Sequence, residues 1–353
     1  MAILQALGND AETVLWIGSE GGMEADLVRR ADIPFNSIPA AGLHGVGLRA
    51  LPGNTWRLLQ GTLASRRILR QYHPDVLLFT GGFVAVPMAV AGSRIPTLLY
   101  VPDIEPGLAL KVLAHFASII GLTAENSRQY FKSSPRCEVT GYPTRSDLQV
   151  WEPQSARRHL HLEADQPVLL VFGGSKGARS LNRAVQAILP QLLQRMQVLH
   201  ISGKLDWPEV ETTWRNLPPE IASRYHAYPY LHEEMGAALA SANLVVSRSG
   251  ASSLGEFPHY GLPAILVPYP YAWRYQHVNA DYLAQNGAAV VIRDEQLGTD
   301  LLPGIQSLLD EPARLESMSR AMRSLARPQA ADKLAELVRQ LASHSNLTGK
   351  GPE

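Results

Sequence analysis

The stretch VLLVFGGSKGARSLN, residues 168–182, decides the fold of this chain. Its first five residues, Val168–Phe172, are all apolar and predict a buried strand, while the pattern over Ala178–Gln194 predicts an amphipathic helix. The glycine-rich turn between them is so short that the strand leads almost directly into the helix. A strand, a tight turn and a helix in this order form the repeating unit of a doubly wound α/β domain with a parallel sheet.

The same alternation of short apolar runs and longer amphipathic stretches continues on both sides of this unit. Further strands are expected at Val14–Ile17, Val76–Phe79, Thr97–Val101, Ile119–Leu122, Glu138–Thr140, Gln197–Ser202, Leu244–Ser247, Ala264–Val267 and Ala288–Ile292. Further helices are expected at Gly22–Ala31, Thr55–Gln71, Leu108–Phe116, Ser127–Lys132, Glu233–Ser241, Ser252–His259, Tyr275–Asn286 and Leu301–Leu309. We therefore expect two tandem doubly wound, Rossmann-like domains at residues 1–148 and 149–327. Residues 328–353 are expected to form a helix that packs back toward the first domain, with a frayed tail.

Length and composition agree with this organisation. The chain has 353 residues, which suits two domains, and 46% of them are apolar while 18% are charged, as in a globular protein. Lys and Arg number 32, as do Asp and Glu, so there is no basic excess of the kind that a general nucleic-acid binder shows. The single cysteine, Cys137, excludes a disulfide framework and favours a reducing compartment. No apolar run approaches the roughly 20 residues that span a bilayer.

The N-terminus departs from the doubly wound pattern. Such a domain usually opens with a strand and a glycine-rich turn, whereas Ala2–Leu7 already has the pattern of a helix. We therefore expect the first strand of the N-terminal domain to be absent from this chain, and the natural gene to begin roughly 10–20 codons upstream. The alternative is a sheet that closes up without that strand.

The glycine-rich turn itself has two interpretations. Gly173, Gly174 and Gly177 would let a phosphate approach the backbone, where free N–H groups and the positive end of the helix dipole attract it. Ser175 would add a hydroxyl and Lys176 a charge. Alternatively, this is an ordinary turn whose glycines serve close packing, because the motif is neither a P-loop nor a dinucleotide fingerprint.

Two further polar clusters follow strands of the same domain. In Ser247–Glu256, Ser249 and Ser252 could cap a helix or bind an anion, and Glu256 could accept hydrogen bonds from a ribose diol or merely complement the helix dipole. Gln276 and Asn279 share a helix face, where amides can bind sugar hydroxyls. Because each cluster follows a parallel strand, all three are expected at one edge of one sheet.

Taken together, these motifs resemble the MurG family of glycosyltransferases, family 28. The resemblance covers nearly the whole chain and rests on Met23–Leu27, Gly81 and Gly82 with Pro87, Gly141–Arg145, Gly173–Ala178, Ser249–Ala251 with Glu256, and Gln276 with Asn279. It implies the GT-B fold and inverting transfer of N-acetylglucosamine from UDP-N-acetylglucosamine to the undecaprenyl-diphosphate-linked muramoyl peptide (lipid I to lipid II) of peptidoglycan synthesis. It also implies a peripheral protein of the cytoplasmic membrane face, without metal, other cofactor or nucleic acid.

The resemblance assigns roles to residues of the donor side. It places Ser175 on the diphosphate, Arg145 in the UDP-sugar site and the backbone of Leu231 on the uracil. It places Gln276, with Asn279, on the sugar hydroxyls. The segment that it implies for the sugar and ribose is Ala251, Ser252, Ser253, Leu254, Gly255 and Glu256, with Glu256 on the ribose.

The acceptor side departs from the family pattern. Gly81 and Gly82 match it, but the N-terminal loop with its histidine is missing, and Asp103 stands where the family has an asparagine. Asp103 and Glu105 are candidates for the general base. The alternative is an ordinary turn between two prolines, in which such carboxylates are common.

Five arginines without any acidic residue lie between Leu43 and His73, interleaved with apolar residues. They are Arg49, Arg57, Arg66, Arg67 and Arg70. They belong either to the solvated face of an ordinary helix or to a surface that docks on anionic lipid, which a lipid-linked acceptor favours.

Two other functions stay open at this point. A UDP-N-acetylglucosamine 2-epimerase would use the same donor without any lipid, and a non-catalytic relative would bind the UDP-sugar and transfer nothing.

Overall fold

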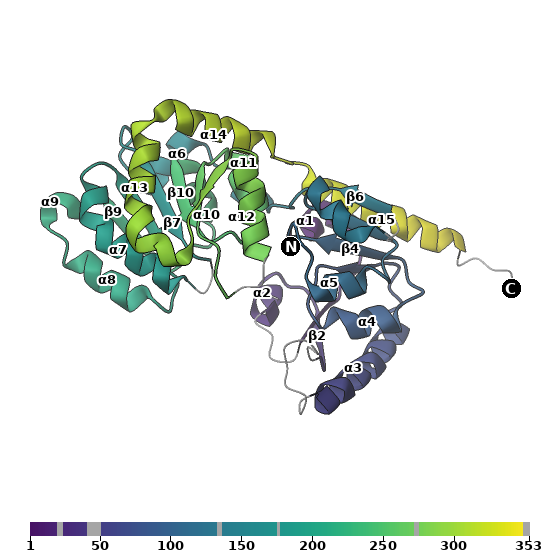
Figure 1. The fold of residues 1–353 in the computed structure, drawn as a ribbon. Coiled ribbons are helices and arrows are strands. Elements are labelled where there is room, and N and C mark those ends of the chain that lie inside the picture. Colours follow the sequence, from purple (N-terminus) through teal and green to yellow (C-terminus); the bar gives the residue numbers. More distant parts are fainter. Residues whose placement is uncertain (20–23, 41–50, 133–135, 175–176, 272–274, 349–353) are drawn as a thin grey trace. The chain divides into compact units, whose positions relative to one another are not determined.

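The computed structural model describes the chain except for residues 20–23, 41–50, 133–135, 175–176, 272–274 and 349–353 (Figure 1). It divides into two units. The first comprises Met1–Pro102, Pro106–Thr140 and Ala331–Glu353, and the second comprises Asp103–Glu105 and Gly141–Ala330. Both units pair their strands in parallel, so the predicted α/β class with two Rossmann-like domains is confirmed.

The second unit has one six-stranded sheet with the order β12-β11-β10-β7-β8-β9. Its strands are β7 Val168–Phe172, β8 Gln197–Ile201, β9 Tyr225–Tyr228, β10 Leu244–Ser247, β11 Ala264–Leu266 and β12 Ala289–Val291. The chain starts at β7, moves outward through β8 and β9, and then returns to the other side of β7 for β10. The order therefore reverses between β7 and β10, and this switch point is where doubly wound sheets bind ligands.

Helices accompany this sheet, and the longer ones bury an apolar face in the core of the unit. The helices are α6 Pro153–His159, α7 Arg179–Leu193, α8 Trp207–Arg215, α9 Pro219–Ala222, α10 Met235–Ser241, α11 Ser253–Tyr260, α12 Tyr275–Gln285, α13 Leu297–Asp310 and α14 Pro312–Ser324, with short 3-10 turns η4 Ser146–Leu148 and η5 Asp294–Gln296. In α7, for example, Leu181, Val185 and Leu189 recur every fourth residue and are fully buried in one core with strand residues such as Val171. This spacing places them on one face of the helix.

The first unit has two separate parallel sheets, β1-β2 and β3-β4-β5-β6. Their strands are β1 Trp16–Ser19, β2 Phe35–Ile38, β3 Leu77–Phe79, β4 Thr97–Val101, β5 Ile119–Leu122 and β6 Arg136–Val139. In the described part of the unit, no strand pairs with both β1 and β3. The chain does open with the predicted helix, α1 Ala2–Leu7.

The remaining elements of the first unit are mostly helical. They are η1 Gly8–Asp10, α2 Glu24–Arg30, α3 Leu51–Tyr72, α4 Ala85–Ala91, α5 Leu108–Leu113, η3 Glu125–Phe131 and α15 Ala330–Thr348. Helix α15 is tied to the start of the chain, because Arg339 donates a 2.7 Å hydrogen bond from Nε to Asp10 and another from Nη2 to the carbonyl of Ala6. The tail expected to fray from Ser343 is helical as far as Thr348.

Several elements differ from their prediction for physical reasons. Strands β2 and β9 are absent from the predicted set because each lies at the outer edge of its sheet and carries polar side chains, so neither forms a continuous apolar run. The expected helix Ser127–Lys132 is part of the 3-10 turn η3. The strand expected at Val14–Ile17 begins only at Trp16.

Candidate functional site

Two of the predicted clusters leave the sheet of the second unit on neighbouring strands. Strands β7 and β10 pair in parallel, with Phe172 opposite Ser247 at their carboxyl ends. The glycine-rich turn 173–177 follows one strand and the turn 248–252 follows the other. Both turns therefore border the switch point, as the sequence predicts.

In the glycine-rich turn, close packing explains two of the three glycines. A Cβ at Gly173 would overlap Ala178, and a Cβ at Gly177 would overlap the carbonyl oxygen of Ser202. Gly174 and Gly177 both have a positive φ, +94° and +80°, which favours glycine, but only at Gly174 does nothing lie within 4 Å of the Cβ position. The packing interpretation thus holds for Gly173 and Gly177, and Gly174 keeps an open approach for a ligand.

Helix α7 begins immediately after this turn. Its N-cap residue is Ala178, and in the described part of the chain no side chain caps its first turn. Unsatisfied N–H groups at such a helix end attract anions. The side chains of Ser175 and Lys176 lie outside the described residues.

The turn after β10 is held to helix α12 by a side-chain hydrogen bond. Ser249 is fully buried and donates a 2.7 Å hydrogen bond from Oγ to the carbonyl of Gln276. Ser249 therefore does not cap a helix, in contrast to one of the two interpretations of the sequence. Ser252 is the N-cap residue of α11, but its hydroxyl bonds to the Glu256 carboxylate.

The carboxyl group of Glu256 at this edge of the sheet has a strongly raised pKa. Burial raises its pKa to about 7, although the hydrogen bond from Ser252 and the charge of Arg145 both act to lower it. Arg145 is also paired with Asp147 at 3.5 Å. The carboxyl group of Glu256 is therefore close to half ionised at neutral pH and is ready to respond to a hydrogen-bonding ligand.

The segment before Glu256 has a packing role as well. A Cβ at Gly255 would lie 2.7 Å from the ring of Tyr142. Burial raises the pKa of the Tyr142 phenol, and the negative charges of Glu256 and Asp103 raise it further. Gly255 thus permits an aromatic ring to pack next to the Glu256 carboxyl group. Leu254 and Ser253 are buried, while Ala251 and Ser252 are half-buried at the turn.

Gln276 and Asn279 lie on α12, but their amides are used differently. Gln276 accepts a 2.9 Å hydrogen bond at Oε1 from the N–H of Tyr269. Asn279 is fully buried: Oδ1 accepts from the N–H of Ile104 at 3.0 Å, and Nδ2 donates to Asp103 Oδ1 at 2.8 Å and to the carbonyl of Ser249. In this arrangement Asn279 holds protein groups in place, and its predicted sugar contact stays a prediction.

Asp103 and Glu105 are half-buried and belong to the second unit. Burial raises the pKa of Asp103, and the hydrogen bond from Asn279 partly opposes this rise. A buried carboxylate with a raised pKa is a stronger base than an exposed one. Leu231 is half-buried and follows β9.

The other predicted residues belong to the first unit. Gly81 and Gly82 follow β3 with φ values of +117° and +85°. On α3, the side chains of Arg57, Arg66, Arg67 and Arg70 are all exposed. Arg49 lies outside the described residues.

The sequence did not reveal a buried cation at the switch point. Arg248 is only 7% exposed and pairs with Asp294 at 2.6 Å. It also donates a 2.8 Å hydrogen bond to the hydroxyl of Ser180, in the first turn of α7, and its guanidinium lies 5.4 Å from the ring centre of Tyr269. The feature of the sequence that could have indicated it is a single arginine within a turn of small residues. Among the described residues, no group of three or more His, Cys, Asp or Glu is placed to hold a metal ion.

Comparison with known families accounts for most of the chain. Residues 1–121 match the glycosyltransferase family 28 N-terminal domain, and residues 168–336 match the glycosyltransferase family 28 C-terminal domain. A protein of Roseiflexus sp. (strain RS-1) is 39% identical over 93% of this chain and 84% of its own length. One of Listeria welshimeri is 36% identical over 95% of this chain and 92% of its own. Both are named UDP-N-acetylglucosamine--N-acetylmuramyl-(pentapeptide) pyrophosphoryl-undecaprenol N-acetylglucosamine transferase.

Solved structures show the same fold at lower identity. MurG of Acinetobacter baumannii superposes with a TM-score of 0.73 at 24% identity, covering 96% of this chain and 95% of its own. The UDP-GlcNAc 2-epimerase of Neisseria meningitidis, bound to UDP-GlcNAc, has a TM-score of 0.65 at 12% identity and covers 96% of both chains. Transferases and epimerases thus share this architecture, and the fold alone does not separate them.

Proposed function

Because this chain belongs to glycosyltransferase family 28, we propose that it transfers N-acetylglucosamine from UDP-N-acetylglucosamine to an N-acetylmuramyl-(pentapeptide) pyrophosphoryl-undecaprenol. The observation that carries this proposal is the β7–β10 switch point of the second unit. There, an uncapped helix end, a buried arginine and a half-buried carboxyl group border a single edge of the sheet. These groups complement a nucleoside diphosphate sugar, which combines a diphosphate with sugar hydroxyls.

On the donor side, each group has a chemical counterpart. The diphosphate lies against the N-terminal end of α7 and the turn 173–177, while Arg248, paired with Asp294, holds the first turn of α7 through Ser180. Glu256 accepts hydrogen bonds from the ribose diol, and the amide nitrogen of Gln276 donates to a hydroxyl of the transferred sugar. Arg145 and the backbone of Leu231 complete the site on the sugar-nucleotide and uracil sides.

In the transfer step, an acceptor hydroxyl attacks the anomeric carbon while the bond to the UDP oxygen breaks. A carboxylate takes the hydroxyl proton, and Asp103 is the better candidate because its pKa is raised and Asn279 fixes its orientation. The α7 terminus stabilises the negative charge that develops on UDP. A single displacement inverts the anomeric configuration.

The first unit supplies a docking surface for the lipid-linked acceptor. On α3, Trp56, Leu59 and Leu63 are 62%, 55% and 64% exposed and follow one another at spacings of three and four residues. They therefore share a face of the helix, with exposed arginines at 66, 67 and 70 continuing the same stripe. An apolar stripe with adjacent cations fits an anionic membrane surface at the cytoplasmic face. Among the described helices, none is both long and apolar enough to cross a bilayer.

A transfer assay tests the proposed function. The chain is incubated with UDP-N-acetylglucosamine and the lipid-linked muramoyl-pentapeptide, and both the disaccharide lipid and UDP are measured. We expect UDP release only when the acceptor is present. Conversion of UDP-N-acetylglucosamine without acceptor would indicate a 2-epimerase instead, and binding without any turnover would indicate a non-catalytic relative.

A further inference from the structure

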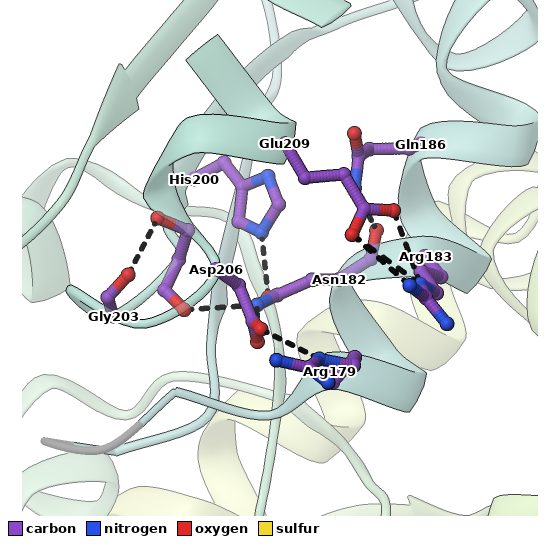
Figure 2. A network of polar contacts seen from close by, with 9 residues as sticks. Arg179, Asn182, Arg183, Gln186, His200, Gly203, Asp206 and Glu209 are labelled. Carbon is purple, nitrogen blue, oxygen red and sulfur yellow. Dashed lines mark hydrogen bonds and ion pairs between the residues drawn. The ribbon is translucent and has the colours of Figure 1, made fainter. Parts of the chain in front are cut away.

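A network of hydrogen bonds joins strand β8 to the start of helix α7 in the second unit (Figure 2). His200, on β8, is fully buried, and its Nδ1 lies 2.7 Å from the hydroxyl of Tyr225 on β9. Its Nε2 lies 2.9 Å from Oδ1 of Asn182 on α7. The network thus links two neighbouring strands to the helix that starts at the turn.

Asn182 determines the polarity of this network. It is 1% exposed, and its Nδ2 donates to the carbonyl of Ser202 at 2.8 Å and to Oδ2 of Asp206 at 2.9 Å. Both partners only accept hydrogen bonds, so the amide oxygen must face His200, whose Nε2 therefore carries the proton. His200 Nδ1 then accepts from Tyr225. Burial lowers the pKa of His200 to about 4, so the ring stays neutral near pH 7.

At its other end, the series of hydrogen bonds ends in an ion pair between Asp206 and Arg179. Asp206 is 6% exposed, and its Oδ1 accepts a 2.9 Å hydrogen bond from Nε of Arg179, the first residue of α7. Figure 2 shows Asn182, Asp206 and Arg179 converging between α7 and the loop that precedes α8. The start of α7 and the β8–α8 loop are therefore held together by side chains as well as by the sheet.

One atom of this network, the carbonyl oxygen of Ser202, lies close to Gly177 of the glycine-rich turn. The carbonyl oxygen of Ser202, which Asn182 holds, is the same atom that a Cβ at Gly177 would overlap. Gly177 itself closes the turn, because its N–H donates a 2.9 Å hydrogen bond to the carbonyl of Gly174. The position of the Ser202 carbonyl therefore limits where Gly177 can lie.

We infer that Asn182 is a positioning residue for the diphosphate of the nucleotide sugar, acting through the Ser202 carbonyl on Gly177 and the start of α7. This inference rests on the proposed function, since it assumes that the turn receives the diphosphate. In this role Asn182 does not contact the ligand. It fixes the position of the backbone at Gly177 and at the start of α7, which we propose contacts the diphosphate.

Comparison of UDP with uridine tests the inference, because uridine lacks the diphosphate. Affinities are measured by competition against a fluorescent UDP derivative for the wild type and Asn182→Ala. We expect at least a tenfold weaker affinity for UDP and less than a twofold change for uridine. The matched control is Gln186→Ala, because Gln186 lies one turn further along α7, bonds to the backbone of Asn182 and to Thr213, and should leave both affinities unchanged.

A second variant keeps the test valid if Asn182→Ala folds poorly. Gly177→Ala introduces the overlap with the Ser202 carbonyl directly, strains a backbone with a φ of +80°, and should also produce a selective loss of UDP affinity. In the double variant, the combined loss should be smaller than the sum of the two single losses, since both variants act in part through one carbonyl. Equal losses for UDP and uridine, no loss for either, or additive losses would overturn the inference. A wild-type chain that binds uridine but gains nothing from the diphosphate would overturn the proposed donor site itself.

Discussion

The two units of this chain both build parallel sheets, but they differ in how continuous those sheets are. In the second unit, β7 lies between β8 and β10, so the sheet is continuous over six strands. In the first unit, β1-β2 and β3-β4-β5-β6 are separate sheets among the described residues. A strand edge without a partner leaves backbone groups that must find other hydrogen bonds, at about 1–3 kcal/mol for each buried group left unsatisfied. In the second unit, β7 therefore has a partner on each side and also leads into the glycine-rich turn.

The sharpest test of this difference removes one core side chain from each unit. Leu189 in α7 and Leu113 in α5 are both fully buried in their units. Replacement of either leucine by alanine should cost about 2–5 kcal/mol of unfolding free energy in its own unit. In calorimetry, we expect two transitions, with Leu113→Ala lowering only the first and Leu189→Ala lowering only the second. A single transition that both variants lower equally would show that the two units unfold together.

Hydrogen exchange should locate the weaker unit without mutation. We expect backbone amides of β1 and β3 to exchange about 100-fold faster than those of β7 and β10, because their sheets are short and open at one edge. The control is internal, since both sets of strands are measured in one sample by mass spectrometry. Equal protection would mean that other contacts stabilise the open edges as well as a central strand would.

We also expect membrane binding and UDP binding to depend on different units, membrane binding on the first and UDP binding on the second. Replacement of Arg66, Arg67 and Arg70 by serine should weaken binding to vesicles that contain anionic lipid by about tenfold at low salt, and by less at high salt. UDP affinity should not change. Vesicles of neutral lipid are the control, and a wild-type chain that ignores both kinds of vesicle would remove α3 as the docking surface.

Glu256→Ala is the counterpart in the second unit. Loss of its carboxylate should weaken UDP binding by about 1–3 kcal/mol, because a charge-assisted acceptor for the ribose is removed. Calorimetry with UDP measures this, and 2′,3′-dideoxy-UDP, which lacks the diol, should bind the wild type and the variant equally. Vesicle binding should be unaffected. A variant with unchanged UDP affinity would exclude Glu256 from the ribose site.

The sequence predicts the elements of both units better than the contacts of the site. Strand β7 and the turn after it follow from neighbouring residues, because periodicity and glycine spacing are local signals. The network of Asn182 is not local: His200 is 18 residues away and meets it only once β7 and β8 are in register. In the same way, the sequence predicts that the amide of Asn279 is available to a sugar. Its partners Asp103 and Ile104 are about 175 residues distant in the sequence, so no local pattern indicates them.

The smallest expected effect concerns pH and again depends on Glu256. Burial raises its pKa to about 7 from an ordinary value of 4.5, so the folded unit ionises this carboxyl group later than the unfolded chain does. Between pH 4.5 and 7, this group therefore reduces the stability of the second unit as the pH rises. A ribose diol favours the ionised form, so UDP affinity should rise by up to about tenfold from pH 6 to pH 8. Glu256→Gln is the matched variant, because it keeps the shape and loses the titration, and its UDP affinity should be nearly flat over this range. If the variant keeps the same pH dependence as the wild type, another group titrates, and the UDP phosphates, with a pKa near 6, would be the next to test by comparison with uridine.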